Sequence, residues 1–181
     1  MFDVFRLWLR ERKEYQLALV GAGITKVGPG VNRDDFPFVE EGPEGKLIRV
    51  YTVHDSWFPL TISDIANDFE SFGLQPLGFK ATIEYLGRLP LEFSKMFIIG
   101  NMKMEMGIYC PQSLALCLER GPDGGTLSRG HDRNEAPRGA TILVVEKEAG
   151  AWQKYREKVE SDELYASMQR TLENIRLEKK Q

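Results

Sequence analysis

Segments in which apolar and polar side chains alternate place the strongest constraint on the fold. Residues 78–87 (GFKATIEYLG) and 96–109 (MFIIGNMKMEMGIY) show this alternation, and residues 46–54 (KLIRVYTVH) and 140–148 (ATILVVEKE) are rich in β-branched side chains. Alternation is typical of a strand with one buried and one solvated face, as found mainly in antiparallel sheets. The sequence therefore predicts an α+β domain, with a mainly antiparallel sheet, helices packed on one side, and helical arms at both ends.

One internal helix is indicated by its capping residues. In the segment 61–73 (TISDIANDFESFG), Thr61 is a good N-cap and Asp64 occupies the third helical position, where its carboxylate can bond back to the cap. Gly73 lies where a helix commonly ends in the left-handed conformation. A helix between these residues is therefore predicted.

The remaining segments of the core have weaker signals. Residues 15–20 (YQLALV) are predicted to form a strand, and residues 21–45 a long irregular connection. Residues 111–120 (PQSLALCLER) are predicted to form a short helix that begins at its proline. Residues 120–139, rich in glycine and polar side chains, are predicted to form a mobile loop.

The chain divides into three parts: an N-terminal amphipathic helix (1–13), a core domain (14–150) and a C-terminal helix (151–181). In the first part, large apolar residues fall on one side at helical spacing and arginines lie elsewhere. Such a helix can contact a membrane interface, another subunit or its own domain. The residues predicted to make this contact are Phe2, Phe5, Arg6, Trp8, Leu9 and Arg10.

The C-terminal helix carries an apolar seam on a charged rod. Its apolar positions are spaced by three and four residues in two runs, Trp152, Tyr155 and Val159, then Tyr165, Met168, Leu172 and Ile175. Ser161 and Asp162 lie between the runs and predict a break with a second helix cap. The seam is predicted to pack on the sheet or to pair with another molecule. The contact residues are predicted to be Trp152, Tyr155, Met168 and Leu172.

Composition excludes several classes of protein. The net charge is −3, so no overall basic field draws the chain to nucleic acid, and direct contact with nucleic acid is not expected. The two cysteines, Cys110 and Cys117, form no CxxC motif, which argues against a disulfide framework or structural zinc and favours a reducing, cytoplasmic location. No apolar run approaches the roughly 20 residues that cross a bilayer, and the N-terminus lacks the pattern of a signal peptide.

The glycine-rich run VGAGITKVGPG (20–30) resembles a phosphate-binding loop only superficially. A dinucleotide loop needs a helix directly after the tight turn, yet Gly28, Pro29 and Gly30 oppose a helix there. The run lacks the lysine and serine or threonine that end a P-loop. It is therefore interpreted as a turn, and no cofactor, metal site or catalytic residue is expected.

Two alternative functions stay open at this point. A small enzyme or nuclease-like subunit would have to assemble its site from scattered residues around His54, Asp55 and Glu84. An RNA-binding module would need arginines clustered on the sheet face.

Three stretches, in this order, resemble one viral family. Residues 52–66 (TVHDSWFPLTISDIA) combine an extended segment, a proline and a Thr-x-Ser-Asp-x-Ala helix start. Residues 98–114 (IIGNMKMEMGIYCPQSL) contain an Ile-Gly pair, a methionine before Ile-Tyr, and Ser-Leu beyond. Residues 143–152 (LVVEKEAGAW) contain Val-Glu-Lys and Gly-Ala-Trp. Together they are similar to rhabdovirus matrix proteins, in particular the vesiculovirus branch, over about residues 50–152.

The resemblance implies a virion protein that self-associates, condenses the nucleocapsid and links it to the inner face of the membrane. The implied partners are further copies of the chain, with which it forms a homo-oligomer, the viral nucleoprotein and membrane lipid. The chain departs from the family in lacking a lysine-rich arm and a Pro-Pro-x-Tyr budding signal. These departures put the recruitment of budding machinery in doubt. A non-enzymatic structural protein is the function predicted.

Overall fold

The structure is a computed structural model. The residues that it describes are 13–29, 31, 47–56, 58–89, 91–99, 114–131 and 135–178. The predicted N-terminal helix lies outside them except for Lys13, and so do Cys110 and the methionines at 102, 104 and 106.

The described residues form one sheet of seven strands. In spatial order, β1, β6, β5, β4, β7 and β2 lie side by side, and β3 also pairs with β7. The strands are β1 (Ile24–Val27), β2 (Ile48–Thr52), β3 (Leu74–Pro76), β4 (Lys95–Ile99), β5 (Leu114–Gly121), β6 (Gly124–His131) and β7 (Thr141–Glu146). The pairs β1–β6 and β4–β7 are parallel, whereas the other four are antiparallel. The predicted α+β fold with a mainly antiparallel sheet is confirmed.

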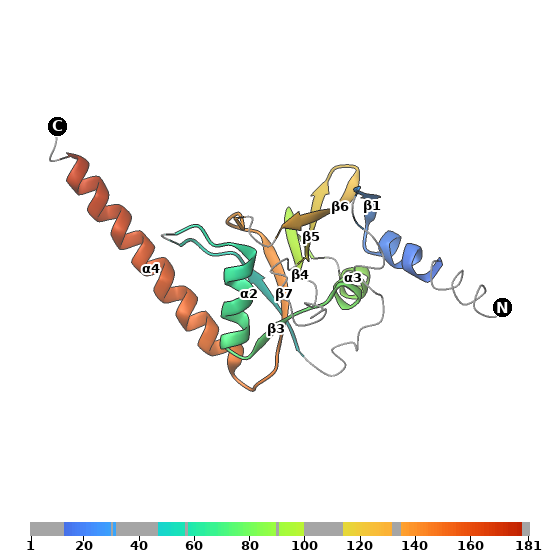
Figure 1. The fold of residues 1–181 in the computed structure, drawn as a ribbon, viewed down its shortest axis with the longest axis horizontal. Helices are drawn as coiled ribbons and strands as arrows, with labels where there is room; N and C mark the ends of the chain where they lie inside the picture. Colours follow the sequence, from blue (N-terminus) through green and yellow to red (C-terminus); the bar gives the residue numbers. More distant parts are fainter. Residues whose placement is uncertain are drawn as a thin grey trace, which may run out of the picture.

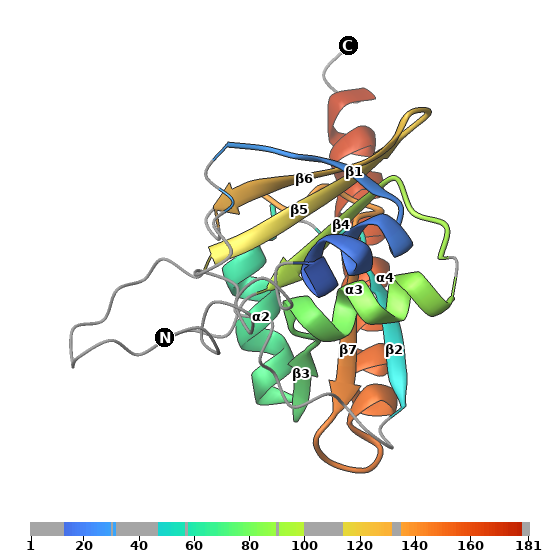
Figure 2. The ribbon, with the colours of Figure 1, turned by 90° about the vertical axis from the view of Figure 1, so that its right-hand side faces the viewer.

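Helices cover both faces of this sheet, rather than one face as predicted. The helix of residues 13–21 and α3 (Phe79–Arg88) pack on one face, and α2 (Ile62–Ser71) and α4 (Ala151–Glu178) on the other (Figures 1 and 2). The strands supply side chains to both layers: in β4, Met96 and Ile98 join the first core and Phe97 and Ile99 the second. The chain thus has two apolar cores separated by the sheet.

The predicted capping of α2 is confirmed in detail. The Thr61 hydroxyl accepts a hydrogen bond from the backbone N–H of Asp64 at 3.1 Å, and the Asp64 carboxylate accepts one from the backbone N–H of Thr61 at 3.0 Å. The Thr61 hydroxyl also donates a hydrogen bond to the Asp64 carboxylate at 2.7 Å. This bond, together with the one from the backbone N–H of Thr61, holds the pKa of Asp64 below its usual value. Gly73 ends the helix region with φ of 73°, as expected of a left-handed cap.

Two segments predicted as strands are helices. Residues 15–20 lie inside the helix of residues 13–21, and residues 79–88 form α3. The alternating pattern of the second segment also satisfies a helical period, because Phe79, Ile83 and Leu86 are spaced by four and three. All three are buried on one side of α3, so the helical period is the one that the fold uses.

Two other predictions fail around the β5–β6 hairpin. Residues 114–121, predicted to be largely helical, form β5, and much of the predicted loop 120–139 forms β6. Ala115, Leu116, Cys117 and Leu118 are all buried, so this strand has apolar neighbours on both faces and shows no alternation.

The glycines of the hairpin serve close packing of strands. A side chain at Gly124 would lie 2.5 Å from the Thr25 side chain, and one at Gly125 would lie 3.1 Å from the Gly23 carbonyl oxygen. These glycines therefore allow β1 to lie close beside β6, although their abundance suggested a loop.

The first half of α4 belongs to the core, and the helix continues without the predicted break at Ser161–Asp162. Tyr155 is only 1% exposed. Four rings surround it, Tyr51, Phe69, Phe72 and Trp152, with centroids 5.2 to 6.4 Å away. Aromatic pairs at this spacing add to the free energy gained by burial.

We predict that Tyr155→Ala destabilises the fold strongly, whereas Tyr165→Ala on the same helix does not. Tyr155 fills the second core, and truncating a buried aromatic typically costs about 3–5 kcal/mol. Tyr165 is 55% exposed, so its loss should change the free energy of unfolding by less than about 0.5 kcal/mol. Urea denaturation at low protein concentration measures both variants, and equal midpoints would contradict the assigned packing.

Candidate functional site

Ion pairs hold α4 against the domain, on the sheet face that it shares with α2. The Lys158 ammonium lies 2.5 Å from Asp68 of α2 and 3.0 Å from Asp162 of α4. Further along the helix, the Arg170 guanidinium donates two hydrogen bonds to Asp55, one of them at 2.6 Å, and Arg138 lies 3.3 Å from the same carboxylate. The bonds from Arg170 favour the ionised form and hold the pKa of Asp55 below its usual value. These ion pairs keep one side of α4 facing the domain.

The opposite side of α4 exposes a row of large apolar side chains. We define the outer stripe as Leu164, Tyr165, Met168, Leu172 and Ile175, which are between 43% and 64% exposed. Ala166 is fully buried although it lies only two residues from Met168. Two residues turn a helix by about 200°, so the buried and exposed lines lie on opposite sides. Contiguous exposed apolar side chains are typical of interaction surfaces.

The predicted contact residues of the C-terminal helix fall into two groups. Met168 and Leu172 belong to the outer stripe and are open to a partner. Tyr155 is enclosed by its own domain and Trp152 is half-buried against it, so the prediction that these two contact another molecule is not supported. Of the predicted N-terminal contacts, Phe2, Phe5, Arg6, Trp8, Leu9 and Arg10 lie outside the described residues.

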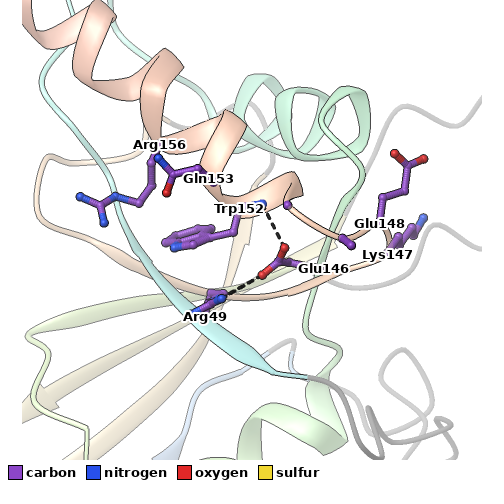
Figure 3. Close-up of a pocket in the computed structure, with 9 residues that line it drawn as sticks. Arg49, Glu146, Lys147, Glu148, Trp152, Gln153 and Arg156 are labelled. Atoms are coloured by element: carbon purple, nitrogen blue, oxygen red, sulfur yellow. Dashed lines mark hydrogen bonds and ion pairs between the residues drawn. The ribbon is translucent and has the colours of Figure 1, made fainter.

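A pocket of about 600 Å³ lies at the start of α4 (Figure 3). The Glu146 carboxylate lies at its centre and accepts hydrogen bonds from the Arg49 side chain at 3.1 Å and from the backbone N–H of Trp152 at 3.3 Å. Glu146 thus supplies a partner for the exposed amides of the first turn. Arg156 on the pocket wall pairs with Glu160. Arg49, Glu146 and Arg156 thus have partners within the chain, and the contacts of Glu146 anchor the start of α4. No motif indicated the pocket in advance, because Arg49 of β2 lies far in the sequence from the other lining residues, which come from the end of β7, the turn after it and the start of α4.

The residues of the predicted enzyme alternative are not brought together. His54 is buried on the second face, where its Nδ1 lies 2.8 Å from the Tyr51 hydroxyl and its Nε2 lies 3.6 Å from Asp162. Asp55 is held by the two arginines, and Glu84 lies on α3, which packs on the other face. Within the described ranges, no three His, Cys, Asp or Glu side chains are arranged to hold a metal ion.

The glycine-rich run has the reverse of the order that a dinucleotide loop requires. The helix of residues 13–21 ends within the run, residues 22–23 form a turn with Gly23 at φ of 75°, and β1 comes next. Phosphate binding in such loops relies on the N-terminus of a following helix. The interpretation as a turn is therefore supported at residues 22–23, whereas Ile24–Val27 extend into a strand.

Cys117 is buried in β5, and burial raises the pKa of its thiol to about 11, so little reactive thiolate forms near neutral pH. In the part of the chain that the structure describes, no helix has the length and apolarity needed to cross a bilayer.

Comparisons with known proteins identify no relative. No model of a known protein family matches the chain, and neither the curated proteins nor the solved structures include a significant match.

We predict that His54 makes stability depend on pH. Burial lowers the pKa of His54 in the folded state, so the unfolded chain binds more protons between that lowered pKa and about 6.5. Wild type should therefore lose stability relative to His54→Gln as pH falls below about 6.5, and the difference should stay constant above it. Urea midpoints between about pH 8 and 5 test this, and parallel curves for the two proteins would contradict it.

Proposed function

We propose that this chain is a non-enzymatic structural protein that acts by self-association. The observation that carries the proposal is the outer stripe, an exposed row of large apolar side chains on a helix whose other side is fixed to the domain. Leaving such a row in water is unfavourable by roughly 25 cal/mol per Å² of apolar area. A partner that covers the row recovers this free energy.

We further propose that the role is that of a viral matrix protein. The support is the resemblance over about residues 50–152, together with a surface suited to assembly. In this role, self-association would build a layer beneath the membrane, and the nucleoprotein would be condensed against it. Phe2, Phe5, Trp8 and Leu9 would contact lipid or a neighbouring subunit, aided by Arg6 and Arg10.

The alternatives receive less support from the geometry. An enzyme site around His54 would need Asp55 and Glu84 to converge on it, but Arg138 and Arg170 hold Asp55, and Glu84 is on the other face. An RNA-binding sheet would need an uncovered face, and helices pack on both faces. Self-association remains the function that the described surface favours.

We expect the purified chain to form concentration-dependent oligomers. Mass action shifts a self-associating protein toward oligomer as its concentration rises. Light scattering across a dilution series measures the average mass directly. A strict monomer at the highest concentration would remove the proposed function.

We also expect residues 1–13 to strengthen binding to membranes. Their large apolar side chains can enter the interfacial region while arginines contact lipid phosphates. Flotation with anionic liposomes should recover more full-length chain than chain lacking residues 1–13. Equal flotation of the two proteins, or none of either, would rule out the membrane part of the proposal.

A further inference from the structure

We propose that the outer stripe pairs with the outer stripe of a second copy of this chain, with the two helices antiparallel. The inference rests on the proposed self-association and specifies its surface and geometry. The partner is argued from the spacing of the stripe and from the charges beside it.

The spacing of the stripe is that of a short coiled coil. Tyr165, Met168, Leu172 and Ile175 follow one another at intervals of three, four and three residues. This is the alternation of positions a and d in a heptad, which packs side chains of one helix between those of another. The a and d positions span about 15 Å at 1.5 Å per residue, enough for a symmetric contact centred between Met168 and Leu172.

Charges on one flank favour the antiparallel arrangement. Asp162, Gln169 and Arg176 occupy successive e positions when Tyr165 is position a. In an antiparallel pair the e positions of the two helices face each other in reverse order. Asp162, which also pairs with Lys158 of its own helix, then lies opposite the partner's Arg176, and Arg176 lies opposite the partner's Asp162. The symmetry of the pair forms this contact twice.

The parallel arrangement would oppose like charges. In that geometry each g position faces the next e position of the other helix. Glu157 would then lie beside the partner's Asp162, and two neighbouring carboxylates repel each other. Arg176 would face the partner's Thr171 and gain no ion pair. The same side chains therefore discriminate against the parallel pair.

The attachment of α4 leaves the stripe accessible in the required orientation. The Arg170–Asp55 and Lys158–Asp68 pairs hold the inner side of the helix on the domain. The C-terminal end of α4 extends beyond the sheet (Figure 1). An antiparallel pair places the two domains toward opposite ends of the paired helices, so neither domain blocks the contact.

Cysteine crosslinking tests the geometry. The test uses a Cys110→Ser background, which keeps the buried Cys117. In an antiparallel pair, residue 171 of one chain lies beside residue 171 of the other, so the Thr171→Cys variant should form an intermolecular disulfide. Ile175→Cys should not, because its partner copy lies about 15 Å further along the axis and a disulfide needs Cα atoms within about 7 Å. Crosslinking of the second variant without the first would show a parallel pair and overturn the proposal.

Charge and stripe variants separate this inference from self-association itself. Met168→Glu with Leu172→Glu should weaken association at least tenfold in sedimentation equilibrium, with the monomer's circular dichroism unchanged because both residues are exposed. Arg176→Glu should weaken it severalfold, whereas Glu157→Lys should leave it unchanged, and tighter association of Glu157→Lys would indicate the parallel pair. Undiminished oligomers in the stripe variant would overturn the inference while retaining the proposed function; a monomeric wild type would remove both.

Discussion

The packing of Tyr155 against the second face of the sheet fixes the arrangement on which the rest of the proposed function depends. Rings from β2, from α2 and its C-cap, and from the first turn of α4 meet at this one side chain. Because the contacts come from three elements far apart in the sequence, they set both the position and the rotation of α4. A helix fixed in rotation must present a defined opposite side to solvent, and in this chain that side is apolar.

Ion pairs also hold α4 to the domain, further along the helix than the aromatic rings. Lys158 reaches α2, and Arg170 reaches the segment after β2. Ion pairs near a surface contribute little stability each, because solvent screens them and the long side chains lose entropy. Their role here is better described as alignment: they keep α4 along the domain beyond the aromatic packing, as far as Arg170. The outer stripe is thus presented on a supported helix.

The sequence predicted those parts of the fold that depend on local signals. The capping residues Thr61 and Asp64 defined α2, and β-branched residues defined β2 and β7. Prediction failed where tertiary packing chose between two compatible patterns, as in α3, whose apolar residues satisfy both a strand and a helix. It also failed where burial on both faces erased the alternation, as in β5. The anchor pocket around Glu146 was beyond sequence reasoning, because only the pairing of β2 with β7 brings Arg49 beside it.

The candidate site shows why an apolar period alone does not identify a partner. Val159 and Tyr165 are six residues apart, and six residues turn a helix by about 240° relative to its starting direction. The interruption at Ser161–Asp162 is therefore a change of face within one continuous helix, although the sequence suggested a break. The first run, with Tyr155, points to the chain's own core, whereas the second, with Met168, points away from it. The first run accounts for the packing of α4 on its own domain, whereas the second run leaves large apolar side chains exposed. This change of face is the physical reason to expect a partner for α4.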